Sequence, residues 1–122
     1  MDNDVLYADG RVKVTYLHSP EPGREEKVTS TEDHELWIKG RSDEWMRYII
    51  PRGVLRELSE GSGRGESLQD LASKLNSINH FILEELGREG IDLTSVQRAI
   101  VGARQTEEEN FRKYLEEQGK LD

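Results

Sequence analysis

Val5-Leu6-Tyr7-Ala8-Asp9-Gly10-Arg11-Val12-Lys13-Val14-Thr15-Tyr16-Leu17 is the stretch of the chain that decides the fold. Two short apolar runs flank Asp9-Gly10, and an Asp-Gly pair in that position is typical of a tight β-hairpin turn. Apolar and polar residues alternate through the second run, which places its apolar side chains on one face of a sheet and its polar ones on the other. The start of the chain therefore predicts an antiparallel sheet with one wet face.

The sheet is predicted to continue to residue 50. Residues 35–39 and 45–50 read as two further strands joined by a turn at 40–43, so the sheet covers residues 4–50 with about four strands. A long acidic connection precedes these two strands. Pro51 ends the last strand and begins a short helix over 51–59.

The second half of the chain is predicted to be helical. Residues 60–66 are rich in glycine and predict a linker; a phosphate-cradling loop is the alternative, which Arg64 keeps open although the usual flanking motif is missing. Apolar residues with helical spacing predict two helices in 67–118, over 67–88 and 94–118. Glu107 interrupts the apolar stripe of the second. The prediction is an α+β fold in one domain, 1–122, with the sheet first, then a short helix and two C-terminal helices.

Composition limits the classes of function. The 122 residues are 34% apolar and 34% charged, so the core is thin and we expect a homo-oligomer to complete it. Cysteine is absent, which excludes disulfides and thiolate chemistry. No apolar run approaches the roughly 20 residues of a membrane span, and we expect a cytoplasmic protein without membrane contact. The net charge of −8 disfavours nonspecific nucleic-acid binding.

The residues that usually carry catalysis are not arranged for it. His18, His34 and His80 are not at the spacings of metal sites, and His34 lies in an acidic run that reads as a solvated loop. Neither a Gly-x-Ser-x-Gly nor a Gly-x-Gly-x-x-Gly motif occurs in a suitable context. We therefore expect a non-enzymatic binding protein without metal or cofactor.

Arginines in the middle of the chain are the candidate ligand-binding residues. Guanidinium groups bind phosphates in a bidentate manner, and an aromatic ring can stack on a base. The alternative is that these arginines only pair with the many glutamates around them. Trp45 is a further stacking candidate. The predicted set is Arg47, Arg52, Phe81, Arg88, Arg98 and Arg104.

The order of elements, a small N-terminal antiparallel sheet and then residues 67–88 and 94–118 as two helices, resembles small phage anti-defence proteins that sequester cyclic ADP-ribose-type signals. The resemblance implies an oligomeric, non-catalytic sponge with arginine and aromatic residues near the helices. We accordingly expect a cyclic or linear nucleotide in a helix/sheet or dimer-interface pocket. The alternative is a protein–protein inhibitor or adaptor that acts through the acidic connection, residues 21–35, or the acidic C-terminal helix, residues 107–117.

Overall fold

The computed structural model describes residues 5–16, 33–51, 53–117 and 119. Its four strands form one antiparallel sheet in the order β1-β2-β3-β4, which confirms the predicted α+β class and the N-terminal sheet. The Asp9 carboxylate holds the first turn, because its Oδ1 accepts hydrogen bonds from the backbone N–H groups of Arg11 and Val12, both at 2.9 Å. The strands are β1 (Val5–Ala8), β2 (Val12–Tyr16), β3 (His34–Lys39) and β4 (Trp45–Ile50).

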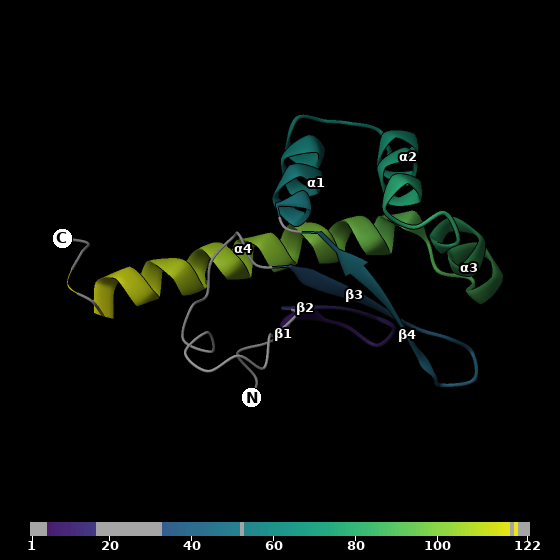
Figure 1. Ribbon diagram of the computed structural model, residues 1–122, viewed down its shortest axis with the longest axis horizontal. Helices are drawn as coiled ribbons and strands as arrows, with labels where there is room; N and C mark the ends of the chain where they lie inside the picture. The colour runs from purple at the N-terminus through teal and green to yellow at the C-terminus, as the bar shows by residue number, and fades with distance from the viewer. Residues whose placement is uncertain (1–4, 17–32, 52, 118, 120–122) are drawn as a thin grey trace.

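Helices cover one face of this sheet. α4 crosses the sheet and contacts β1 and β2, while α1 and α2 pack on α4 from the side away from the sheet (Figure 1). The C-terminal part of α4 continues beyond the edge of the sheet (Figure 1). The helices are α1 (Val54–Gly63), α2 (Leu68–Ile78), α3 (Ile82–Glu89) and α4 (Leu93–Glu117).

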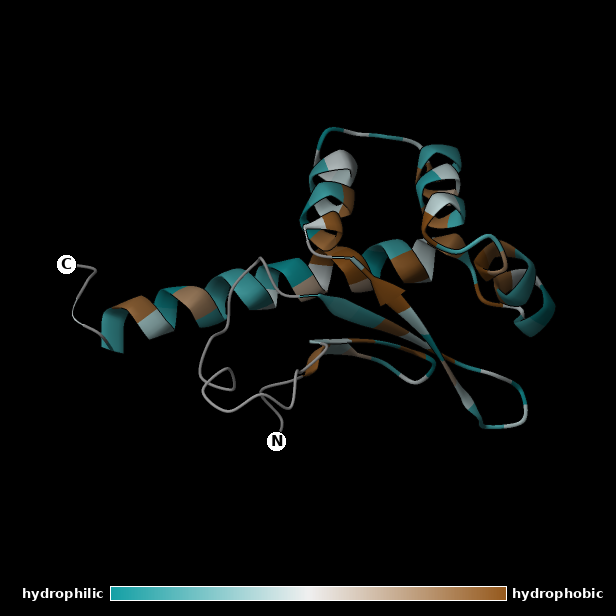
Figure 2. Ribbon diagram, viewed as in Figure 1, coloured by the Kyte–Doolittle hydropathy of each residue, from teal (hydrophilic) through white to brown (hydrophobic). Residues whose placement is uncertain are grey.

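The core lies between the inner face of the sheet and the helices. Alternate strand residues such as Val14, Leu36 and Ile38 are buried, and they belong to the same hydrophobic cluster as Val96 and Ile100 of α4. Figure 2 shows hydrophobic residues concentrated where the helices meet one another and the sheet. None of the helices in the described part of the chain is long and apolar enough to cross a membrane.

The prediction of one helix over 67–88 was wrong, because the chain breaks at Asn79 and forms α2 and α3 instead. Asn79 has an extended backbone (φ −156°, ψ 113°), and its side-chain oxygen accepts a hydrogen bond of 2.9 Å from the N–H of Phe81. Asparagine side chains compete in this way with helical hydrogen bonding. The start at Ser67 is as predicted, with its hydroxyl accepting from the N–H of Asp70.

The linker predicted over 60–66 was also wrong in its first half, because α1 runs on to Gly63. Gly61 is buried at the point where α1 meets the start of α2. A Cβ added to Gly61 would lie 2.5 Å from a carboxylate oxygen of Glu66, which itself pairs with Lys74 at 2.6 Å. A side chain at position 61 would therefore require the Glu66 carboxylate to move. Arg64 also pairs with Glu66, at 3.2 Å.

Candidate functional site

Phe81 and Arg88, two of the predicted ligand-binding residues, lie together at α3. They line an open hollow of about 350 Å³ with Asn79, Glu84 and Glu85. Arg88 is 3.4 Å from Glu85 and 3.8 Å from Glu89, and Phe81 is 58% exposed. Carboxylates outnumber guanidinium groups at this hollow, so its charge does not favour a phosphate.

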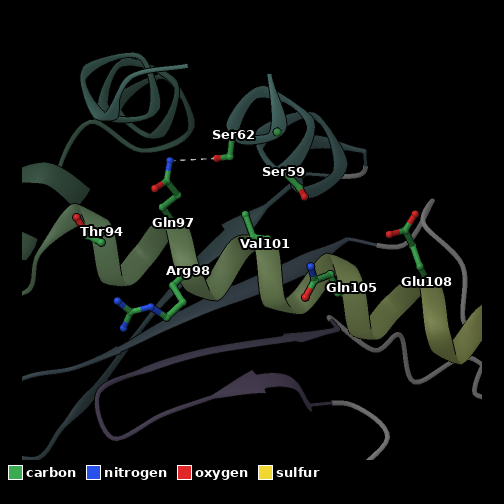
Figure 3. Close-up of a pocket in the computed structure, with 9 residues that line it drawn as sticks. Ser59, Ser62, Thr94, Gln97, Arg98, Val101, Gln105 and Glu108 are labelled. Carbon is green, nitrogen blue, oxygen red and sulfur yellow. Dashed lines mark hydrogen bonds between the residues drawn. The ribbon is translucent and has the colours of Figure 1, made fainter. Parts of the chain in front are cut away.

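Arg98 belongs to a second hollow, of about 540 Å³, between α1 and α4. In Figure 3, Gln97 points toward α1 and donates to the Ser62 hydroxyl at 3.2 Å, while Arg98 points toward the sheet. There the positive charge of Arg98 acts on Asp9 and Tyr7. The groups that face α1 across this hollow are therefore mainly hydroxyls and amides.

Arg104 belongs to a buried cluster on the inner side of the sheet. Its Nη1 donates to Glu107 Oε1 at 2.7 Å, and His34 Nε2 donates to Glu107 Oε2 at 2.8 Å. His34 and Glu107 are each 1% exposed, and the Arg104 side chain is 15% exposed. The ring of Tyr16 stacks on His34 at 5.3 Å. The prediction that His34 lies in a solvated loop was wrong, since it is the buried first residue of β3.

Glu107 remains ionised in this cluster despite its burial. Burial raises the pKa of its carboxyl, but the hydrogen bonds and charges of His34 and Arg104 outweigh burial and hold the pKa below the ordinary 4.5. The carboxylate thus joins the first residue of β3 to the middle of α4. Because Arg104 pairs with this carboxylate, its guanidinium group is committed to an internal contact.

Arg47 lies elsewhere, on the face of the sheet that the helices leave uncovered, which we call the outer face. The register aligns Lys13, Trp37 and Arg47 in one row across β2, β3 and β4, and Lys39 beside Trp45 in the next row. Three cations and both tryptophans of the chain therefore gather on one side of the sheet. The outer face consists of Lys13, Thr15, Glu35, Trp37, Lys39, Trp45, Arg47 and Ile49.

A chain of hydrogen bonds orders the outer face. The indole N–H of Trp37 donates to the hydroxyl of Thr15 at 2.9 Å, and that hydroxyl donates to Glu35 at 2.9 Å. The other oxygen of Glu35 accepts from Arg47 Nη1, also at 2.9 Å. Glu35, only 7% exposed, thus holds the cation of Arg47 directly and the ring of Trp37 through Thr15.

Lys13 is the cation that remains available. Its ammonium lies 4.9 Å from the ring centre of Trp37 and 4.5 Å from that of Trp45, and it makes no ion pair with any residue in the described ranges. Lys39 forms an ion pair with Asp43 at 3.7 Å, and Arg47 forms one with Glu35. The outer face therefore presents two indole rings and a lysine that has no carboxylate partner in the part of the chain that the structure describes.

The predicted residues thus lie in four places, with Arg47 on the outer face, Phe81 and Arg88 at α3, Arg98 near the first hairpin and Arg104 in the buried cluster. Arg52 lies outside the described residues. Sequence reasoning named Arg47 and Trp45 but missed Lys13 and Trp37. Strand alternation was the signal that could have found Lys13 and Trp37, because it assigns both to the wet face once the register is known.

Comparison with protein families, with curated proteins and with solved structures finds no match to this chain. Residue roles accordingly rest on geometry and chemistry. Within the described ranges, histidines and carboxylates form no group of three that could hold a metal ion.

Proposed function

We propose that the protein is a non-catalytic binding protein whose outer face takes a nucleotide-type ligand. The observation that supports this is the pair of indole rings beside Lys13, a cation with no carboxylate partner among the described residues. A base would stack on an indole, and a phosphate would contact Lys13 and the free edge of the Arg47 guanidinium. Holding such a ligand without converting it would lower its free concentration, which is the sequestering role that the resemblance to phage anti-defence proteins implies.

The energies favour this exchange. Stacking of one base on an aromatic side chain contributes about 1–3 kcal/mol. The ligand must displace the Lys13 ammonium from the rings, which costs about 0.5–1 kcal/mol at an exposed site. The displaced lysine then pairs with the phosphate. The outer face is open, so we expect modest affinity that falls as salt concentration rises.

Tryptophan fluorescence is the direct test, because both tryptophans of the chain lie on the outer face. The full chain is titrated with linear nucleotides, with cyclic nucleotides including cyclic ADP-ribose, and with a short single-stranded oligonucleotide. We expect quenching by at least one of them, and a loss of affinity of roughly tenfold in Lys13→Ala, since 1.4 kcal/mol corresponds to a factor of ten.

Phe81→Ala is the matched control, because it removes the exposed aromatic residue of the α3 hollow and leaves the outer face unchanged. Its affinity should equal that of the wild type. The proposal fails if no compound in the panel quenches the fluorescence at low salt. It fails equally if Phe81→Ala weakens binding as much as Lys13→Ala does, which would move the site to α3.

A second candidate is the inhibitor or adaptor function expected from the acidic segments. Much of the acidic connection lies outside the described residues, so the described support is the end of α4, where Phe111 and Tyr114 are 41% and 38% exposed. We rank this second, because its described support is limited to these two exposed rings. A partner protein captured by the full chain and released by Phe111→Ser would favour this candidate.

A further inference from the structure

β4 lies at an edge of the sheet, since it pairs with β3 on one side and with no other described strand. The direction of its backbone groups follows from the turn before it, where the N–H of Gly40 donates to the carbonyl of Glu44 at 2.8 Å. Along an antiparallel strand, every second residue bonds to the same neighbour, so half of β4 bonds to β3 and the other half points away. The residues whose N–H and C=O groups point away from the sheet are Trp45, Arg47 and Ile49.

These outward backbone groups are open to a partner. No N–H or C=O of Trp45, Arg47 or Ile49 bonds to the backbone or side chain of another described residue, and all three residues are exposed. A row of unpaired N–H and C=O groups is a template for a further strand. An extended segment that lies along it gains main-chain hydrogen bonds at every second residue.

The two edges of the sheet differ in how well they could take such a strand. β1 has four residues, its register is irregular between Val5 and Tyr7, and α4 packs against it. Short and irregular edges resist strand addition. β4 has six residues in unbroken register and contains no proline. Strand addition is therefore favoured at β4.

A second copy of this chain fits the edge of β4 poorly. The antiparallel register that pairs all three outward residues sets Arg47 of both copies face to face, and like charges directly opposite each other are destabilising. Shifting the register one way sets Ile49 against Asp43, which has the left-handed turn conformation (φ 67°). Shifting it the other way sets Trp45 against Pro51, which has no N–H to donate. The edge thus suits a strand of different sequence.

We propose that the edge of β4 binds an extended peptide segment of another protein as an additional antiparallel strand, with an acidic residue opposite Arg47 and apolar residues two positions to either side. Residues that face each other in such a pair carry their side chains on the same side of the sheet. The acid then meets the guanidinium of Arg47, which is 52% exposed and has Glu35 at one edge. The apolar residues meet Trp45 and Ile49, which are 37% and 39% exposed. This inference goes beyond the nucleotide site, because it rests on the backbone edge of the sheet.

Fluorescence anisotropy of a labelled, capped peptide, Ser-Val-Thr-Glu-Thr-Val-Ser, titrated with the full chain tests the proposal. We expect binding, and roughly fivefold weaker binding when lysine replaces the glutamate, because a cation then faces Arg47. Methylating the amide nitrogen of the glutamate should weaken binding by roughly tenfold or more, since that N–H donates to β4. The matched control is the peptide methylated at the threonine that follows. Its N–H points away from β4, so its affinity should equal that of the unmodified peptide.

Ile49→Pro makes the same test on the protein, because it removes an edge N–H that does not bond to β3. It should lose peptide binding and keep the far-UV circular dichroism of the wild type. Ile49→Ala is its control, since it shortens the same side chain but keeps the N–H, and it should still bind. If Ile49→Pro does not fold, the two methylated peptides decide the question.

The proposal is overturned if the peptide does not bind at the highest soluble protein concentration, or if the two methylated peptides bind equally well. Binding to a folded Ile49→Pro variant with wild-type affinity also overturns it. So does a wild type that dimerises without peptide while Ile49→Pro stays monomeric, because the edge would then belong to a second copy. None of these measurements uses a nucleotide, so they leave the test of the outer face separate.

Discussion

Replacing Glu107 by alanine should be among the most damaging single changes on α4. The substitution removes two charge-assisted hydrogen bonds, from His34 at 2.8 Å and from Arg104 at 2.7 Å, each worth about 1.5–3 kcal/mol. It leaves His34 buried with neither ring nitrogen bonded to any described residue, because Nδ1 already lacks such a partner. Among the described carboxylates, Arg104, 15% exposed, keeps a distant contact with Glu108 at 3.8 Å.

The expected cost is about 3–5 kcal/mol, the usual effect of removing one member of a buried ion pair. The free energy of unfolding of a typical domain is roughly 5–15 kcal/mol, so the variant should lose a large part of its stability. At roughly 4 °C per kcal/mol for a chain of this size, Tm should fall by about 12–20 °C. Urea unfolding followed by far-UV circular dichroism should show a lower midpoint with an unchanged slope.

Glu108→Ala is the control, because Glu108 is 62% exposed and lies one residue further along the same helix. A surface pair of this kind contributes at most about 1 kcal/mol. A Glu107→Ala variant as stable as Glu108→Ala would refute the reasoning, since the buried carboxylate would then contribute no more than an exposed one.

Two further predictions concern pH and backbone packing. Folding lowers the pKa of Glu107 below 4.5, so its contribution to stability is complete above about pH 5 and is lost as pH falls below 4.5. Urea midpoints measured against pH should therefore fall less steeply in Glu107→Gln; an equal slope would contradict this. Gly87→Ala should raise the free energy of unfolding by about 0.5–1 kcal/mol, because the added Cβ meets no atom within 4 Å. Gly102→Ala should lower it, because the added Cβ would lie 2.7 Å from the Tyr7 ring. Equal Tm changes in the two alanine variants would contradict the second prediction.

Local signals in the chain were sufficient for some elements. The Asp9 side chain closes the first turn with hydrogen bonds to residues two and three positions away, and the N-cap at Ser67 likewise involves neighbours. The break at Asn79 is local as well, but a periodic run of leucines and isoleucines on both sides of it outweighed a single asparagine in the prediction. Periodicity shows which face is apolar and does not show whether the helix axis is continuous.

The candidate sites needed distant parts of the chain to meet. His34 and Glu107 are 73 residues apart, so no local pattern could reveal that a histidine in an acidic run and a glutamate in an apolar stripe satisfy each other. The outer face depends on register in the same way, because Lys13 meets Trp37 and Trp45 only through the pairing of β2 with β3 and of β3 with β4. A shift of one residue would move Lys13 to the opposite face.

The sequence by itself determined the α+β class, the strands, the wet face of the sheet and the helical second half, because alternation, helical spacing and capping act between near neighbours. Only the tertiary structure decided which charged side chains of the described residues form ion pairs with one another and which do not. Glu107 commits Arg104 to the core and Glu35 occupies one edge of Arg47, whereas Lys13 contacts two indole rings and forms no ion pair with another described residue. Electrostatic partners are set by distance in space, and that distance is fixed only when the sheet and helices pack.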